Sequence, residues 1–139
     1  MEHRASFRIK RQAVLFRGGE QVPYQAIIHE AALHMGFGGR DVAKQQLTHL
    51  LKVSEYPDIS LHVIPFDAGG YPGAGQPTYY VHGPVPQLDT VQLDQSHGIT
   101  LLDAEAQLDK YRKVLDRLTT LSLIELQSRS LIHNIVQSL

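Results

Sequence analysis

Apolar residues recur at helical spacing in four segments of the chain, and each segment is predicted to form an amphipathic helix. Asp41 and Asp103 precede two of these segments and are interpreted as helix caps. Ser122 begins a Ser-Leu-Ile-Glu sequence typical of a capping box, and Gly18 is expected to end the first helix. The predicted helices cover residues 3–16, 41–54, about 103–118 and about 122–137.

Shorter segments carry the alternating pattern of strands. Residues 24–33 are ambiguous, because alanine and glutamate favour a helix whereas Pro23 and a pair of isoleucines favour a strand; we interpret the segment as a strand. The other predicted strands lie in residues 59–64, 78–83, 90–95 and 98–102. The whole pattern predicts a single α+β domain over residues 1–139, with a small, mostly antiparallel sheet packed with about four helices.

The sequence contains a glycine-rich stretch, PFDAGGYPGAGQPTYYVHG, at residues 65–83. It resembles neither a phosphate-binding P-loop nor the glycine loop of a dinucleotide-binding fold. It lacks the Gly-Lys-Ser/Thr of a phosphate loop and leads into a strand instead of a helix. No lysine or arginine lies between Val53 and Gln107 to meet a phosphate. We therefore predict an irregular connection, with residues 69–75 more mobile than the strands that flank them.

Composition and charge narrow the classes of function. The chain has 139 residues, a net charge of −1, 42 % hydrophobic residues and no cysteine, which excludes disulfides and thiolate metal sites. Residues 53–107 hold seven acidic residues and no basic one, so a DNA-binding surface is not expected there. Without an apolar leader or membrane span, the chain is expected to be a cytoplasmic protein that does not bind membranes.

The sequence predicts no catalytic residues, no metal site and no cofactor. In HEAALH, His29 and His34 are five positions apart, which places their rings on different sides of a helix or strand. Glu30 lies in an apolar segment, where it is expected either to form an ion pair or helix cap or to anchor a ligand or partner. A ligand or partner pocket is predicted between sheet and helices, near Glu30, His62, Tyr79, Tyr80 and Asp94.

The last helix is apolar around more than half of its circumference, which predicts self-association. The predicted contact residues of a homodimer are Leu131, Ile132, Ile135 and Val136. In the alternative arrangement, the helix at residues 3–16 covers this surface within one monomer by means of Phe7 and Val14.

Several short motifs occur in the order found in a known family. An acidic Glu-Ala-Ala-Leu segment is followed by a glycine pair, a Gln-Leu-x-His-Leu-Leu helix, a Leu-x-Val-Ile-Pro strand and a Gly-Tyr-Pro-Gly loop. In this order, the sequence resembles the C-terminal domain of unknown function in actinobacterial helix-turn-helix regulators of the XRE type, described as antitoxin-like. The resemblance covers about residues 5–132. It departs from the family pattern at Tyr71, where the loop usually has histidine, and at Asp94, where a strand usually ends in glutamate.

The resemblance implies a regulatory domain that follows a DNA-binding module. No segment before residue 3 can hold that module, so the chain is expected to be a fragment or a stand-alone relative that contacts DNA only through a fused helix-turn-helix. A protein-interaction and dimerisation domain is the first expectation, with a homodimer or a small partner protein as the assembly. A small-molecule effector-sensing domain is the alternative, and a small hydrolase or toxin-like enzyme is the second alternative.

Overall fold

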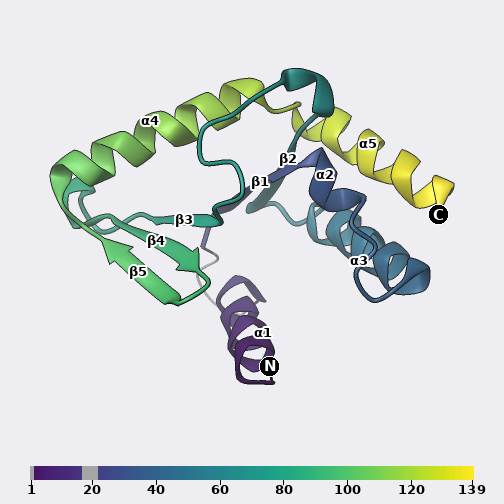
Figure 1. Ribbon diagram of the computed structural model, residues 1–139, viewed down its shortest axis with the longest axis horizontal. Helices are drawn as coiled ribbons and strands as arrows, with labels where there is room; N and C mark the ends of the chain where they lie inside the picture. Colours follow the sequence, from purple (N-terminus) through teal and green to yellow (C-terminus); the bar gives the residue numbers. More distant parts are fainter. Residues whose placement is uncertain (1, 17–21) are drawn as a thin grey trace. The chain divides into compact units, whose positions relative to one another are not determined.

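The computed structural model describes residues 2–16 and 22–139, which divide into two compact units. Unit 1 consists of residues up to Val63 together with Leu123–Leu139, and unit 2 consists of Ile64–Ser122. The described residues contain five α-helices, a two-stranded parallel sheet and a three-stranded antiparallel sheet, so the predicted α+β class is confirmed (Figure 1). The prediction of a single domain stays a prediction.

Unit 1 contains two strands and four helices. The strands β1 (Tyr24–His29) and β2 (Ile59–Ile64) form the two-stranded sheet, and the connection between them contains α2 (Glu30–Leu33) and α3 (Arg40–Val53). A helical crossover is the usual connection between parallel strands. The unit also contains α1 (Glu2–Phe16) and α5 (Glu125–Ser138), and the latter packs against α3.

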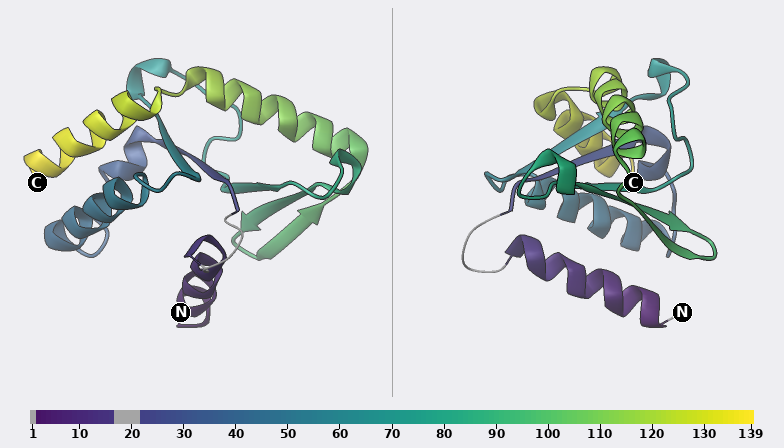
Figure 2. Two further views of the ribbon diagram at one scale, coloured as in Figure 1. Left: turned by 180° about the vertical axis from the view of Figure 1, so that it is seen from behind. Right: turned by 90° about the vertical axis from the view of Figure 1, so that its left-hand side faces the viewer.

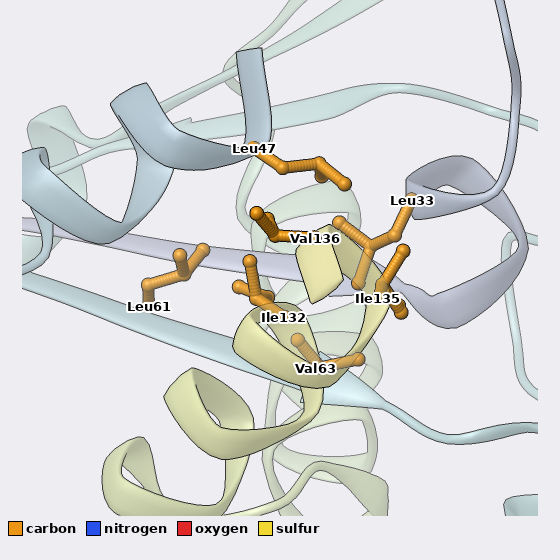
Figure 3. Close-up of a cluster of buried hydrophobic side chains, with 7 residues drawn as sticks. All are labelled: Leu33, Leu47, Leu61, Val63, Ile132, Ile135 and Val136. Carbon is orange, nitrogen blue, oxygen red and sulfur yellow. The ribbon is translucent and has the colours of Figure 1, made fainter. Parts of the chain in front are cut away.

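The core of unit 1 is formed by seven aliphatic side chains that point toward one another (Figure 3). They come from α2, α3, β2 and α5, so each of these elements buries its apolar side in one shared cluster. The cluster consists of Leu33, Leu47, Leu61, Val63, Ile132, Ile135 and Val136.

Unit 2 consists of the three-stranded sheet and α4 (Glu105–Leu121) (Figures 1 and 2). The strands β3 (Thr78–Val81), β4 (Thr90–Gln95) and β5 (Gly98–Leu102) lie in that order, with β4 in the centre. Val91 and Leu93 of β4 are buried against Leu108 of α4. Alternate residues on each strand therefore face the helix, and the residues between them lie on the opposite face of the sheet.

The structure corrects the interpretation of residues 24–33. The strand ends at His29, and Glu30–Leu33 forms the short helix α2. The Nδ1 atom of His29 accepts a hydrogen bond from the backbone N–H of Ala31 at 3.1 Å, which caps the helix. The alanine and glutamate of this segment therefore determine its second half, and the isoleucine pair determines its first half.

The three predicted caps are also corrected. Asp41 lies within the first turn of α3, whose N-cap is Gly39, and Asp103 precedes Ala104, the N-cap of α4. Ser122 ends α4, because its backbone N–H and its hydroxyl donate hydrogen bonds to the carbonyls of that helix. The expected helix end at Gly18 lies outside the described residues.

The glycine-rich stretch connects β2 to β3, as predicted. It contains one short 3₁₀ turn, Phe66–Ala68, and is otherwise irregular before β3; a second 3₁₀ turn, Pro86–Leu88, follows β3. Gly69, Gly73 and Gly75 have positive φ angles, a conformation that side chains with a Cβ rarely adopt. The predicted mobility of residues 69–75 stays a prediction.

Candidate functional site

A cluster of polar side chains in unit 2 is centred on Asp89, which is only 3 % exposed. Asp89 lies just before β4, at the end of the second 3₁₀ turn. The hydroxyl of Tyr80, on β3, donates a hydrogen bond to Oδ2 of Asp89 at 2.6 Å. The backbone N–H of Gly83 donates to Oδ1 at 2.8 Å, so both carboxylate oxygens are engaged.

Gly83 is required at its position by close packing. A Cβ atom there would lie 2.5 Å from the backbone oxygen of Leu88, which is shorter than any normal contact. The absence of a side chain lets the two ends of the 82–89 connection approach each other, and this approach brings the N–H of Gly83 to Asp89.

Arg112 of α4 joins the cluster from the helix side. Its Nε atom donates to the hydroxyl of Tyr80 at 2.8 Å, and its Nη2 atom donates to the carbonyl of Pro86 at 2.9 Å. Nη2 also lies 3.4 Å from Oδ2 of Asp89, and Nη1 donates to Oε1 of Glu105 at 3.0 Å. One guanidinium therefore links the helix, a strand and the connection between β3 and β4.

The cluster changes the ionisation of its members. Burial raises the pKa of Tyr80, and its hydrogen bond to the Asp89 carboxylate raises that pKa further. The hydrogen bonds from Tyr80 and from the Gly83 backbone lower the pKa of Asp89. Hydrogen bonds to Glu105 and Tyr80 raise the pKa of Arg112. The folded unit thus favours an ionised Asp89, a neutral Tyr80 and a charged Arg112.

The hydrogen-bonding capacity of this cluster is used within the chain. The Tyr80 hydroxyl donates to one partner and accepts from another, and all three guanidinium nitrogens of Arg112 have partners. His82 approaches Asp89 to 3.7 Å from an exposed position. Shifted pKa values occur both in active sites and in structural ion-pair networks. Because the hydrogen-bonding groups of this cluster are already paired within the chain, a structural network is the favoured interpretation. Its hydrogen bonds to Gly83, Pro86 and Asp89 hold the connection between β3 and β4 in place.

The sequence-predicted pocket residues have separate environments. Glu30 and His62 lie in unit 1, where Oε1 of Glu30 is 3.4 Å from Nε2 of His34 and Nδ1 of His62 donates to the carbonyl of Leu123 at 2.9 Å. In unit 2, Tyr80 lies on the face that packs against α4. Tyr79 and Asp94 lie on the opposite face, because Tyr79 pairs with Gln92 and the Gln92 amide donates to Asp94.

A shallow groove of about 450 Å³ in unit 2 has none of the five predicted residues in its lining. It lies beside α4 and is lined by Pro72, Ala106, Asp109, Lys110, Lys113 and Val114. The ion pair between Lys113 and Asp109, at 3.0 Å, lies within this lining. Across residues 2–16 and 22–139, no group of three or more histidine or acidic side chains is arranged to hold a metal ion.

Sequence reasoning missed Asp89 and Arg112. Arg112 had a detectable signal, since it lies four residues after the buried Leu108 and therefore occupies the apolar face of α4. A cation at such a position needs an acceptor. Asp89 had no comparable signal, because an aspartate before a strand is common in exposed turns.

The predicted dimer residues on α5 are placed inside unit 1. Ile132, Ile135 and Val136 belong to its core, and Leu131 packs against the same cluster (Figure 3). These side chains are therefore used for folding and do not form an exposed surface. Phe7 and Val14 of α1 are exposed.

An exposed apolar surface lies instead on the sheet of unit 2. On the face opposite α4, Val81 is 57 % exposed, Ile99 is 52 % exposed and Leu101 is 65 % exposed. The register places Leu101 opposite Gln92 and Ile99 opposite Asp94, so these side chains share one face. We call this surface the open sheet face, defined by Val81, Ile99 and Leu101.

A family model that describes a domain of unknown function, DUF5753, matches residues 1–134. The chain belongs to this family. No curated protein and no solved structure matches the DUF5753 domain described here. Among its described helices, none has the length and apolar character needed to cross a membrane.

Proposed function

We propose that this DUF5753 domain is the regulatory, protein-interaction and dimerisation domain of a helix-turn-helix transcriptional regulator of the XRE type, and that it does not bind DNA by itself. The observation that carries the proposal is the open sheet face. Val81, Ile99 and Leu101 are all more than half exposed on one sheet face. Large apolar side chains exposed on one face are characteristic of protein interaction sites.

The charge distribution supports the proposal that the domain does not bind DNA by itself. Residues 53–107 contribute seven acidic side chains and no lysine or arginine, and they include all three strands of unit 2. A surface that binds the phosphate backbone needs clustered basic side chains. The open sheet face is therefore suited to a protein partner, either a second copy of the chain or a small partner protein.

A dimerisation domain suits the DNA-binding module that the sequence resemblance implies. Helix-turn-helix proteins bind paired half-sites as two-fold dimers, and the domain that holds two such modules together determines their affinity for the operator. The proposed role of the DUF5753 domain is to provide this link. DNA contact would come from a fused helix-turn-helix module.

The proposal is tested by fusing residues 1–139 to a helix-turn-helix module that is monomeric by itself and needs dimerisation to occupy a palindromic operator. We expect the fusion to repress a reporter at least roughly tenfold better than the module joined to a monomeric carrier, because dimerisation raises the effective concentration of the second module. In a gel shift at physiological salt, the isolated domain should bind duplex DNA no better than a neutral control protein.

Two results would contradict the proposal. The fusion could repress no better than the module on its monomeric carrier, which would remove the dimerisation role. Alternatively, the isolated domain could form a sequence-specific, submicromolar complex with DNA, which would show that the domain itself recognises an operator.

A further inference from the structure

Strand β5 is an edge strand. It pairs with β4 over the whole of Gly98–Leu102, and no other strand among the described residues pairs with its second side. In an antiparallel ladder, backbone groups point alternately toward one neighbour and toward the other. Every second residue of β5 therefore directs its N–H and C=O toward the outer edge, where another strand can pair.

β5 lacks the features by which proteins usually protect an edge. Its sequence, Gly-Ile-Thr-Leu-Leu, contains no charged residue and no proline, and Ile99 and Leu101 are exposed. The other edge strand, β3, directly follows Pro77, and a second proline, Pro84, lies shortly after it. β5 is therefore the edge that is open to pairing.

We propose that β5 pairs antiparallel with β5 of a second copy of the chain, in a two-fold arrangement centred on Thr100. The inference rests on the proposed function, because it identifies the partner and the contact of the dimerisation domain. The two sheets would join into one continuous sheet of six strands, and the exposed Ile99 and Leu101 side chains of both copies would lie together on one face.

The register centred on Thr100 is complementary to itself. In two-fold pairing at this centre, the numbers of any two residues that face each other add up to 200. Ile99 then faces the partner's Leu101, and Thr100 faces the partner's Thr100. Apolar pairs and threonine pairs are both favourable between neighbouring strands. Gly98 faces the partner's Leu102, where the absence of a side chain leaves room for leucine.

Polar complementarity extends the same register beyond the strand ends. His97 lies in the turn before β5 and Asp103 lies directly after β5, and both are exposed. Centring on Thr100 places His97 opposite the partner's Asp103 at both ends of the pairing. A shift of the centre by a full residue would lose these pairs and would place Ile99 opposite a residue other than leucine. The observed sequence therefore specifies both the partner and the register.

The experiment uses two variants of the full chain, Ile99→Lys and Leu101→Glu. Both side chains are exposed, so neither change is expected to alter the circular dichroism spectrum or the melting temperature of the monomer. In sedimentation velocity over a concentration series, each variant should dimerise at least about tenfold more weakly than the native chain, because both apolar cross-strand pairs are lost and like charges meet diagonally across the two-fold axis.

An equimolar mixture of the two variants provides the decisive measurement. In a mixed dimer, the Ile99→Lys change of one chain lies opposite the Leu101→Glu change of the other, while the second Ile–Leu pair stays intact. The mixture should therefore regain a dimer that neither variant forms alone. The matched control is Val81→Lys, which adds a charge to the open sheet face on the opposite edge strand and should leave dimerisation unchanged.

Three results would overturn the inference: a native chain that stays monomeric at all concentrations, a dimer that Ile99→Lys leaves unchanged, or a mixture that does not regain the dimer. The fusion assay distinguishes an error in the proposed β5 contact from an error in the proposed dimerisation role. If the native fusion represses and the fusion with Ile99→Lys represses equally well, the domain dimerises through another surface. If the native fusion does not repress, the dimerisation role itself is wrong.

Discussion

At the scale of single residues, Asp89 shows how the charge of a buried acidic side chain can be compensated. Burial of a carboxylate is unfavourable unless its charge is compensated, and here two short hydrogen bonds and a guanidinium provide the compensation. The same contacts explain why the pKa of Asp89 is lowered, since they are made to its ionised form.

The lowered pKa of Asp89 leads to a prediction about acid stability. The pKa of the folded state lies below the ordinary value of 3.8, so the unfolded chain binds a proton first as the pH falls. The contribution of Asp89 is therefore present above pH 3.8 and is lost as the pH falls through its folded-state pKa. Asp89→Asn should lower the melting temperature near neutral pH and flatten its decrease below about pH 4.

Thermal unfolding followed by circular dichroism between pH 3 and pH 7 checks this prediction. The matched control is Asp116→Asn, on the exposed side of α4. It should keep the neutral-pH melting temperature and the acid dependence of the native chain. Equal melting temperatures for Asp89→Asn and the native chain at every pH would show that the cluster does not stabilise unit 2.

Ser128 provides a second prediction at this scale. It is fully buried, and its Oγ atom accepts a hydrogen bond from the backbone N–H of Val63 at 2.9 Å and donates to the carbonyl of Leu123 at 3.2 Å. Ser128→Ala would leave the Val63 N–H buried without a partner. We expect a loss of about 1–3 kcal/mol in the free energy of unfolding, measured by urea denaturation.

The control for this substitution is Ser130→Ala on the same helix. Ser130 is exposed, and its hydroxyl bonds only to the carbonyl of Leu126 within the helix. Its replacement should change the free energy of unfolding by no more than about 0.5 kcal/mol. If Ser128→Ala loses no more stability than Ser130→Ala, the buried hydrogen bond does not contribute the expected stability.

At the scale of elements, the sequence predicts most helices and strands because their apolar spacing is a local property. The prediction fails in residues 24–33, where helix and strand preferences compete. It also fails at Ser122, which the pattern predicts as the start of the last helix but which ends α4. Propensity cannot decide such cases, because the choice depends on hydrogen bonds that form only in the folded chain. The His29 cap of α2 is one of these bonds.

The candidate site was less predictable than the elements. The sequence predicts Tyr80 as a pocket residue, but its hydrogen-bond partners lie nine and 32 positions away along the chain. The sequence predicts a dimer contact for the apolar residues of α5, because it does not show how much of a helix is covered by the core of its own chain. The structure buries Ile132, Ile135 and Val136, and leaves Leu126 near the start of the helix exposed.

At the scale of the whole molecule, the chain of unit 1 is interrupted by unit 2. It leaves unit 1 after Val63 and returns at Leu123, and the backbone N–H of Leu123 donates to the carbonyl of Val63 at 2.8 Å. The two ends of the interruption are thus hydrogen-bonded neighbours. A connection of a few residues is enough to join two such positions, as in a hairpin.

This geometry predicts that unit 1 folds without residues 64–122. All seven residues of its core lie outside that segment, as do the partners of Ser128. A chain in which a Gly-Ser linker of about four residues replaces the segment should keep a helical circular dichroism spectrum, dispersed amide resonances and a cooperative urea transition. A shortened chain that also lacks α5 should be unfolded, because α5 supplies three of the seven core residues. If the first shortened chain is also unfolded, unit 1 depends on unit 2 for folding, and the chain is the single cooperative domain that the sequence predicts.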